Sequence, residues 1–320
     1  INSLDQVWKW KEFFTLISFI CSFLLIVPLS RLLLQSSFFS CLAKDVPKLI
    51  EKPKGDAKFI YWGLILISGL IACLTYIPMA ELSKLIFLKS SSRLQTWFFP
   101  QRMNNAVMLW ALVNGLAGIA LFYLCTRHLK NKKDIRIDFN SIKISKTDFF
   151  KTFLLSIIIF CFYYTILFFI YFLFHVDYRF LFLGVRVFRP EILFLLLMYS
   201  PFFITFFLSN SLRVNVLMRF KNESYLKRVL FGGLTTTMGL LMIILLQYTV
   251  FMFSGTVYWN TSNHWLYVNL LFGVIPMIFI LPAFNISFFS LTGKVYLGPI
   301  TTCIIFIMIL LSNTVCYIPI

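Results

Sequence analysis

Charge is scarce in this sequence, and acidic charge is scarcer than basic charge. Only 13% of the 320 residues are charged and 12 of them are Asp or Glu, whereas soluble domains carry about 25% charged residues. Hydrophobic residues make up 60% of the chain, which is more than one core of this size could hide from water. These proportions exclude an ordinary soluble fold and predict an all-α, polytopic integral membrane helix bundle.

The motifs of common enzyme classes are also missing. The chain contains no G-x-S-x-G, H-E-x-x-H, Walker or G-x-G-x-x-G pattern. Its seven cysteines have no C-x-x-C spacing and lie mostly in apolar runs, so we expect packing residues rather than metal ligands or disulfides. No serine has an evident activating partner. We therefore predict no catalytic residue, no cofactor and no metal site within these 320 residues.

Apolar runs long enough to cross a bilayer recur along the chain. A crossing helix needs about 20 apolar residues for a hydrocarbon core of ~30 Å. About eight helices satisfy this, near residues 13–34, 59–79, 105–125, 149–174, 191–209, 229–253, 265–285 and 296–317. We treat residues 1–320 as one transmembrane helical domain. Because the first residue is Ile, we expect the domain to be part of a longer chain.

Lys and Arg are distributed unevenly between the two sides of this arrangement. Of the 29, 20 lie at or near the loops after helices one, three, five and seven, and Arg213 is one of them. By the positive-inside rule this side is cytoplasmic and both termini lie outside. We expect the net charge of +17 to face anionic lipids at the cytoplasmic face of the plasma membrane rather than nucleic acid.

One predicted outer loop gathers charge between two very apolar runs. The stretch "HVDYRFLFLGVRVFRPE" contains His175, Asp177, Arg179, Arg186 and Arg189, which we take as a candidate interfacial polar cluster. An Arg held near the interface by a carboxylate can bind anionic headgroups. Basic side chains can equally snorkel to the interface and fix the depth of the helices. A histidine beside an aspartate can also serve in acid–base chemistry, so three roles stay open.

The predicted helix interiors carry almost no charge, which disfavours an ion-coupled pump. Uncharged polar residues could still line a path through the bundle. These are Asn114, Thr235, Thr236, Thr237 and Gln247. In the helix near 105–125, Ala111 and Gly115 form a small-xxx-small pair with Gly118 close by, and such residues let helix backbones approach closely.

Three stretches, in order along the chain, share features with one family. They are the Trp-rich "DQVWKWKEFFTLISFICSFLLIVPL", the segment "TWFFPQRMNNAVMLWALVNGL", and "VDYRFLFLGVRVFRPEILFLLLMYSPFFITFFLSNSLRVN". Together they resemble the C-terminal multi-pass membrane region of large bacterial membrane-bound α/β-hydrolase proteins. The resemblance implies a hydrolase domain upstream, on the outer face, with its serine, acid and histidine outside this chain.

Two functions follow as hypotheses. The first is a membrane domain that anchors an extracytoplasmic α/β-hydrolase, esterase- or lipase-like, and presents ester-type or amphipathic substrates to it. The second is a permease or transporter subunit with no enzymatic activity. The sequence preceding Ile1 would distinguish them most directly.

Overall fold

The structure is a computed structural model that describes residues 24–43, 62–75, 78, 102–130, 143–174, 190–217, 224–253 and 275–315. Within these ranges every regular element is helical and none is a strand, which confirms the all-α class for this part of the chain. The elements are the Leu24–Gln35 helix, η1 (Ser40–Ala43), the Trp62–Thr75 helix, α4 (Arg102–Lys130), α5 (Lys146–Phe174), α6 (Pro190–Ser211), the π-helical η3 (Leu212–Leu217), α7 (Tyr225–Phe253), α9 (Ile275–Thr292) and α10 (Leu297–Val315). Each long helix overlaps one of the ranges expected from the sequence.

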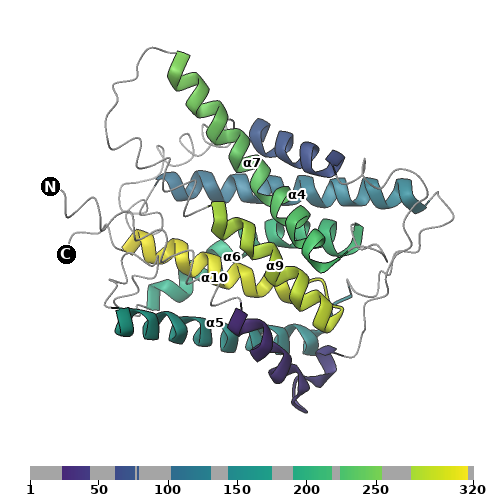
Figure 1. Ribbon diagram of the computed structural model, residues 1–320, viewed down its shortest axis with the longest axis vertical. Helices are drawn as coiled ribbons and strands as arrows, with labels where there is room; N and C mark the ends of the chain where they lie inside the picture. The colour runs from purple at the N-terminus through teal and green to yellow at the C-terminus, as the bar shows by residue number, and fades with distance from the viewer. Residues whose placement is uncertain are drawn as a thin grey trace.

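Helix α6 lies at the centre of the packing. It contacts α4 on one side and α10 on the other, and α10 in turn packs against α5 and α9. Helix α7 joins the bundle mainly through α9. Figure 1 shows α4 and α5 on opposite sides of the molecule, with α6, α9 and α10 between them. The bundle is therefore held together largely by contacts between helices that are distant in sequence, such as α4 with α6 and α6 with α10.

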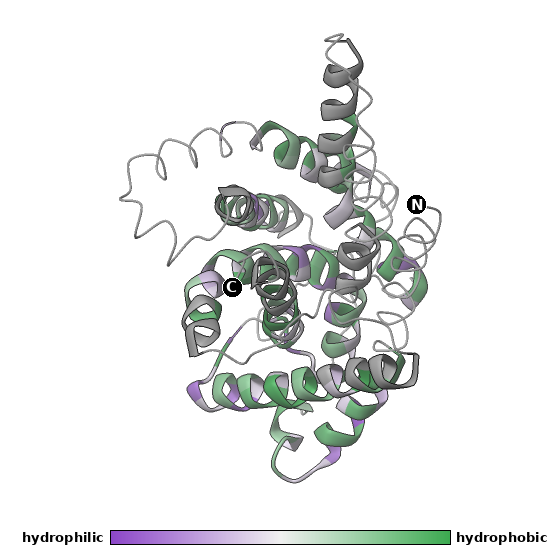
Figure 2. Ribbon diagram, turned by 90° about the vertical axis from the view of Figure 1, so that its left-hand side faces the viewer, coloured by the Kyte–Doolittle hydropathy of each residue, from purple (hydrophilic) through white to green (hydrophobic). Residues whose placement is uncertain are grey.

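The described helices are apolar over much of their length, as the hydropathy colouring in Figure 2 shows, and large apolar side chains such as Leu66 and Leu116 are exposed. Within the described residues, the stretch Met108–Arg127 of α4 is long and apolar enough to cross a membrane. The Leu24–Gln35 and Trp62–Thr75 helices and the stretch Leu297–Ile307 are apolar but shorter. One such stretch is compatible with a membrane protein, but it does not set the number of crossings.

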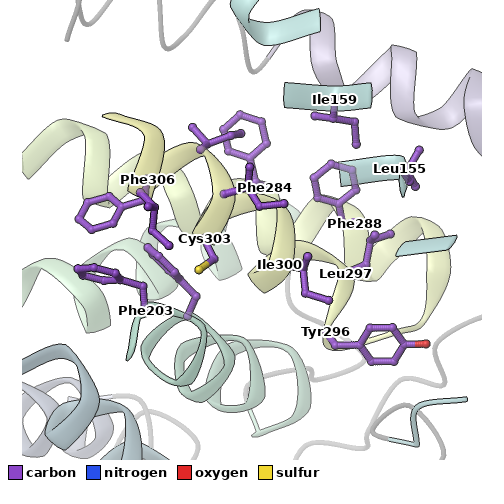
Figure 3. Close-up of a cluster of buried hydrophobic side chains, with 14 of the residues drawn as sticks. Leu155, Ile159, Phe203, Phe284, Phe288, Tyr296, Leu297, Ile300, Cys303 and Phe306 are labelled. Atoms are coloured by element: carbon purple, nitrogen blue, oxygen red, sulfur yellow. The ribbon is translucent and has the colours of Figure 1, made fainter. Parts of the chain in front are cut away.

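The core between α6 and α10 is aromatic. The ring centroid of Phe306 lies 5.0 Å from that of Phe203 and 5.5 Å from that of Phe207, both in edge-on contact. On the other side of α10, Phe288 of α9 lies in the same cluster as Leu155 of α5 (Figure 3). Close packing of such large side chains gives each of them many dispersion contacts.

Helices α4 and α6 approach closely at Gly115. A Cβ atom at this position would lie 2.7 Å from the backbone nitrogen of Phe206 and 2.7 Å from the Thr205 carbonyl carbon. Only glycine permits this approach, because neither neighbouring atom belongs to a flexible side chain. The small-residue face expected on this helix is thus confirmed as a packing face.

Helix α9 ends beyond the range 265–285 expected from the sequence. It continues to Thr292, and Gly293 then adopts the left-handed conformation with φ of 70°. The Gly293 amide donates to the carbonyl four residues earlier at 2.8 Å, which closes the helix end. The helix extends this far because Asn285 and Ser287, which read as the end of an apolar run, are buried inside the bundle.

Polar side chains join the end of α6 and η3 to the α9–α10 connection, and α9 to α10. The Ser211 hydroxyl donates to the Val295 carbonyl at 2.9 Å, and the Asn215 amide donates to the Ser211 oxygen at 2.9 Å. The Thr302 hydroxyl also lies 3.4 Å from the Asn285 side-chain oxygen. These bonds fix the angle at which the chain leaves α6, and so they determine where the neighbouring Arg213 lies.

Candidate functional site: a buried arginine and its polar surroundings

Buried polar side chains converge where α4, the Trp62–Thr75 helix, α6 with η3, and α7 meet. Ser68, Asn114, Arg213, Thr235 and Thr236 are all buried there, none more than 8% exposed. They come from four helices that are far apart in the sequence. Buried polar groups of this kind need partners, because an unmet donor or acceptor costs free energy in an apolar interior.

Arg213 is the centre of this group and is only 5% exposed. It is the second residue of the π-helical turn η3, a geometry that often occurs at functional positions. Side chains on a helix lean toward its N-terminus, and the Arg213 side chain does so, since its Nε donates to the Ser209 carbonyl at 3.2 Å. One guanidinium nitrogen donates to the Ser68 hydroxyl, which links α6 to the Trp62–Thr75 helix.

The guanidinium lies against Gly118 of α4. A Cβ at Gly118 would stand 3.4 Å from the guanidinium carbon and 2.8 Å from the Ser209 hydroxyl. Gly118 is near the middle of the apolar stretch Met108–Arg127, about 13 to 15 Å from either end at 1.5 Å per residue. The positive charge of Arg213 therefore lies near the centre of the most membrane-like stretch described.

This position corrects the sequence-based interpretation of Arg213 as a cytoplasmic loop residue. The apolar run of α6 ends in "SNSLR", which reads as the start of a polar connection. In the structure, α6 extends to Ser211 and the chain stays buried through η3. The arginine is thereby carried back into the bundle instead of out to the membrane surface.

Hydrogen bonds tie α4 to the Trp62–Thr75 helix beside this charge. The Trp110 indole N–H donates to the Ala72 carbonyl at 2.9 Å. The Asn114 amide donates to the Thr75 hydroxyl at 3.0 Å and to the Trp110 carbonyl at 2.9 Å. These bonds hold α4 and the Trp62–Thr75 helix together beside Arg213.

Helix α7 supplies the remaining wall through two threonines. The Thr235 hydroxyl donates to the Gly232 carbonyl at 2.8 Å and accepts from the Asn210 amide at 3.1 Å. The Thr236 hydroxyl lies 3.0 Å and 2.9 Å from the carbonyl oxygens of Gly232 and Gly233. Asn210 and Thr235 thus form a direct polar contact between α6 and α7.

We expect a double-mutant cycle to detect this contact. Asn210→Ala and Thr235→Val, alone and together, should show a coupling of about 0.6 kcal/mol, the average that double-mutant cycles give for polar pairs between membrane helices. Unfolding of the purified protein in detergent would measure it. The control pairs Asn210→Ala with Thr237→Val, because the buried Thr237 donates within α7 to the Gly233 carbonyl. A coupling equal in both cycles would contradict the assignment.

The group lines a cavity of about 20 Å³. Its lining residues are Ser68, Ile71, Ala72, Trp110, Asn114, Gly118, Phe206, Arg213, Thr235 and Thr236. Half of the wall is polar and half is apolar, and the single charged group is a cation. Such a site can stabilise a small negative or electron-rich group by electrostatics. Among the described residues, no three His, Cys, Asp or Glu side chains come together as a metal site.

The candidate cluster named from the sequence cannot be compared with this site. His175, Asp177, Arg179, Arg186 and Arg189 lie outside the described residues. Their roles in headgroup binding, helix anchoring or acid–base chemistry therefore stay predictions.

Sequence reasoning identified part of the new site and missed its centre. Asn114, Thr235 and Thr236 were recognised as polar residues within apolar helices, and all three line the cavity. Thr237 is buried but does not line it. Arg213 was missed, since no sequence signal separates an arginine that ends a helix at the surface from one that folds back into the interior.

Comparison with protein-family models, curated proteins and solved structures finds no match for this chain. The resemblance to the membrane region of α/β-hydrolase proteins therefore remains an expectation from the sequence. What the chain does has to be argued from its composition and from the arrangement of its side chains.

Proposed function

We propose that the chain is a polytopic membrane domain of about eight crossings in the plasma membrane, with both termini outside. The supporting observation is the distribution of side chains in the described helices. Large apolar residues point outward with more than half of their surface exposed: Leu66, Leu74, Leu116, Leu124, Leu197 and Leu245. The interior instead holds Arg213 and many Ser, Thr and Asn side chains. Lipid accommodates the outer leucines, and polar contacts then help to hold the helices together.

Helix length supports the same proposal. Helices α4, α5 and α7 each have 29 residues, or about 43 Å at 1.5 Å per residue, and a hydrocarbon core measures ~30 Å. Helix α6 has 22 residues and reaches about 33 Å. Pro201 within α6 is tolerable in such a helix because neighbouring groups can satisfy the freed carbonyl.

The domain would serve as the anchor of an extracytoplasmic α/β-hydrolase and present amphipathic, ester-type substrates to it. The sequence resemblance supports this part, together with the predicted outer position of the N-terminus. The partners would then be the lipid bilayer, with anionic lipids at the cytoplasmic face, and a hydrolase domain that precedes Ile1 in the full protein.

Reporter fusions test the topology. Green fluorescent protein fused after Lys130 should fluoresce, and alkaline phosphatase at the same point should be inactive, because this loop is proposed to be cytoplasmic. Fusions after Phe253 should give the opposite pattern, because the next loop is proposed to be outside. The proposal places an odd number of membrane crossings between Lys130 and Phe253. If both fusion points give the same reporter result, that number is wrong.

Labelling of active serines tests the hydrolase assignment. Membranes that contain the complete natural protein are treated with a fluorophosphonate, which reacts with the activated serine of α/β-hydrolases. We expect a labelled band at the mass of the full protein, and prior heating should abolish the label. If the full-length protein is correctly inserted but does not react with the fluorophosphonate, the hydrolase assignment is ruled out. The proposed membrane topology is not affected by that result.

A transporter without enzymatic activity is the second candidate, and the buried charge of Arg213 favours it. Ionisable residues at membrane depth commonly mark substrate or ion pathways. The cavity beside Arg213 is only about 20 Å³, so a transported molecule would require a further opening of the bundle. If the full protein does not react with the fluorophosphonate but takes up a substrate when reconstituted in vesicles, it is a transporter rather than a hydrolase anchor.

A further inference from the structure

Arg213 has no carboxylate partner within the described residues. These residues contain two carboxylates, Asp148 and Glu191. Glu191 lies 22 positions before Arg213 in the chain, about 33 Å away along α6. Asp148 is in the first turn of α5, which packs mainly on α10 and η1. A buried cation without a counter-charge is costly in an apolar interior.

The donors of Arg213 are only partly used by the described residues. Two of the five N–H groups that a guanidinium carries bond to the Ser209 carbonyl and the Ser68 hydroxyl. Ser68 accepts from Arg213, so its own hydroxyl hydrogen remains available as a donor. Both residues line the same cavity. A charged donor and a neutral donor therefore converge on one small space.

The size of that space restricts its occupant. A cavity of about 20 Å³ exceeds the ~10–15 Å³ needed for one water and suits a single small ion or oxygen atom. The apolar wall of Ile71, Ala72 and Phe206 lowers the local dielectric, which strengthens attraction between opposite charges. The Thr235 and Thr236 hydroxyls can turn from their carbonyl partners to supply further donors.

We propose that the cavity between Arg213 and Ser68 binds one small anion. The site holds a single negatively charged atom between the guanidinium and the Ser68 hydroxyl, and a free halide such as chloride meets this requirement. The proposal does not depend on the hydrolase assignment, because it rests on contacts within the bundle alone.

Anion-dependent stability tests the proposal. The complete natural protein is purified in an uncharged detergent, and its thermal midpoint is measured as sodium chloride replaces sodium gluconate at constant sodium. We expect the midpoint to rise and saturate, as it does when a ligand binds only the folded state. Bromide should act like chloride, while gluconate is too large for the cavity.

Four variants assign this effect to the cavity. Arg213→Gln should weaken chloride binding by on the order of 100-fold. Arg127→Gln removes the same charge from an exposed position of α4 and should behave as the wild type. Ser68→Ala should weaken binding about tenfold, whereas Ser30→Ala, a buried serine whose hydroxyl bonds to the Ile26 carbonyl, should not.

Two results would overturn the proposal. The first is a wild-type protein that does not respond to chloride, as expected if an acidic side chain elsewhere in the chain neutralises Arg213. The second is an equal response in wild type and Arg213→Gln, which would place the anion elsewhere. If Arg213→Gln does not fold, the comparison of Ser68→Ala with Ser30→Ala decides, since equal affinities would refute the site.

Discussion

Gly115→Ala is expected to destabilise the bundle, although alanine favours helix formation. A Cβ at this position would lie 2.7 Å from the Phe206 nitrogen and the Thr205 carbonyl carbon. These are backbone atoms of α6, so the clash can be relieved only if α4 and α6 move apart. Overpacking costs about 1–3 kcal/mol and sometimes more, while alanine returns about 1 kcal/mol of helix propensity.

We therefore expect a net loss of up to about 2 kcal/mol from Gly115→Ala, measured by unfolding in detergent. Because α4 carries Asn114 and Gly118, chloride binding should weaken in the same variant. Gly63→Ala is the matched control, since a Cβ there would meet nothing within 4 Å. Gly63→Ala should leave stability unchanged or raise it. If Gly115→Ala and Gly63→Ala have the same free energy of unfolding, α4 and α6 do not approach closely at Gly115.

Phe203→Ala is expected to be strongly destabilising. Phe203 is 2% exposed and its ring lies 5.0 Å from that of Phe306, between α6 and α10. Truncation of a buried Phe costs about 3–5 kcal/mol in soluble proteins. Part of that cost is transfer to water, which is smaller when lipid surrounds the helices. The void and its lost dispersion contacts remain.

We expect a loss near the lower end of that range, about 3 kcal/mol, for Phe203→Ala. Phe203→Leu should recover part of it by filling most of the void. Phe150→Ala is the control, because Phe150 is 63% exposed on α5 and should face lipid. Equal losses for Phe203→Ala and Phe150→Ala would show that the α6–α10 interface is not a packed core.

The site illustrates where sequence reasoning succeeds. Asn114, Thr235 and Thr236 stand out in the sequence because a polar residue inside an apolar helix has to face a neighbour. Gly115 stands out for a related reason, since a small residue marks a close contact. Neither signal names the partner helix. That information requires the packing of α6 against α4 and the contact of Asn210 with Thr235.

Arg213 illustrates where it fails. Its position after an apolar run is typical of a residue at the membrane surface, and the positive-inside rule counts it there. The π-helical turn and the bond from Ser211 to Val295 keep this segment inside the bundle instead. The Ser211–Val295 bond joins residues 84 positions apart, so no local pattern reports it.

Composition alone predicted an all-α chain suited to an apolar environment, because it has so many hydrophobic and so few charged residues, and the part of the chain that the structure describes is helical throughout its regular elements. Local pattern also marked the small and polar faces of individual helices. Only the tertiary structure decided which faces meet, and hence that Ser68, Asn114, Arg213 and Thr235 line one cavity. The physical reason is that a buried charge is positioned by contacts from several helices at once, whereas each helix is specified by its own residues.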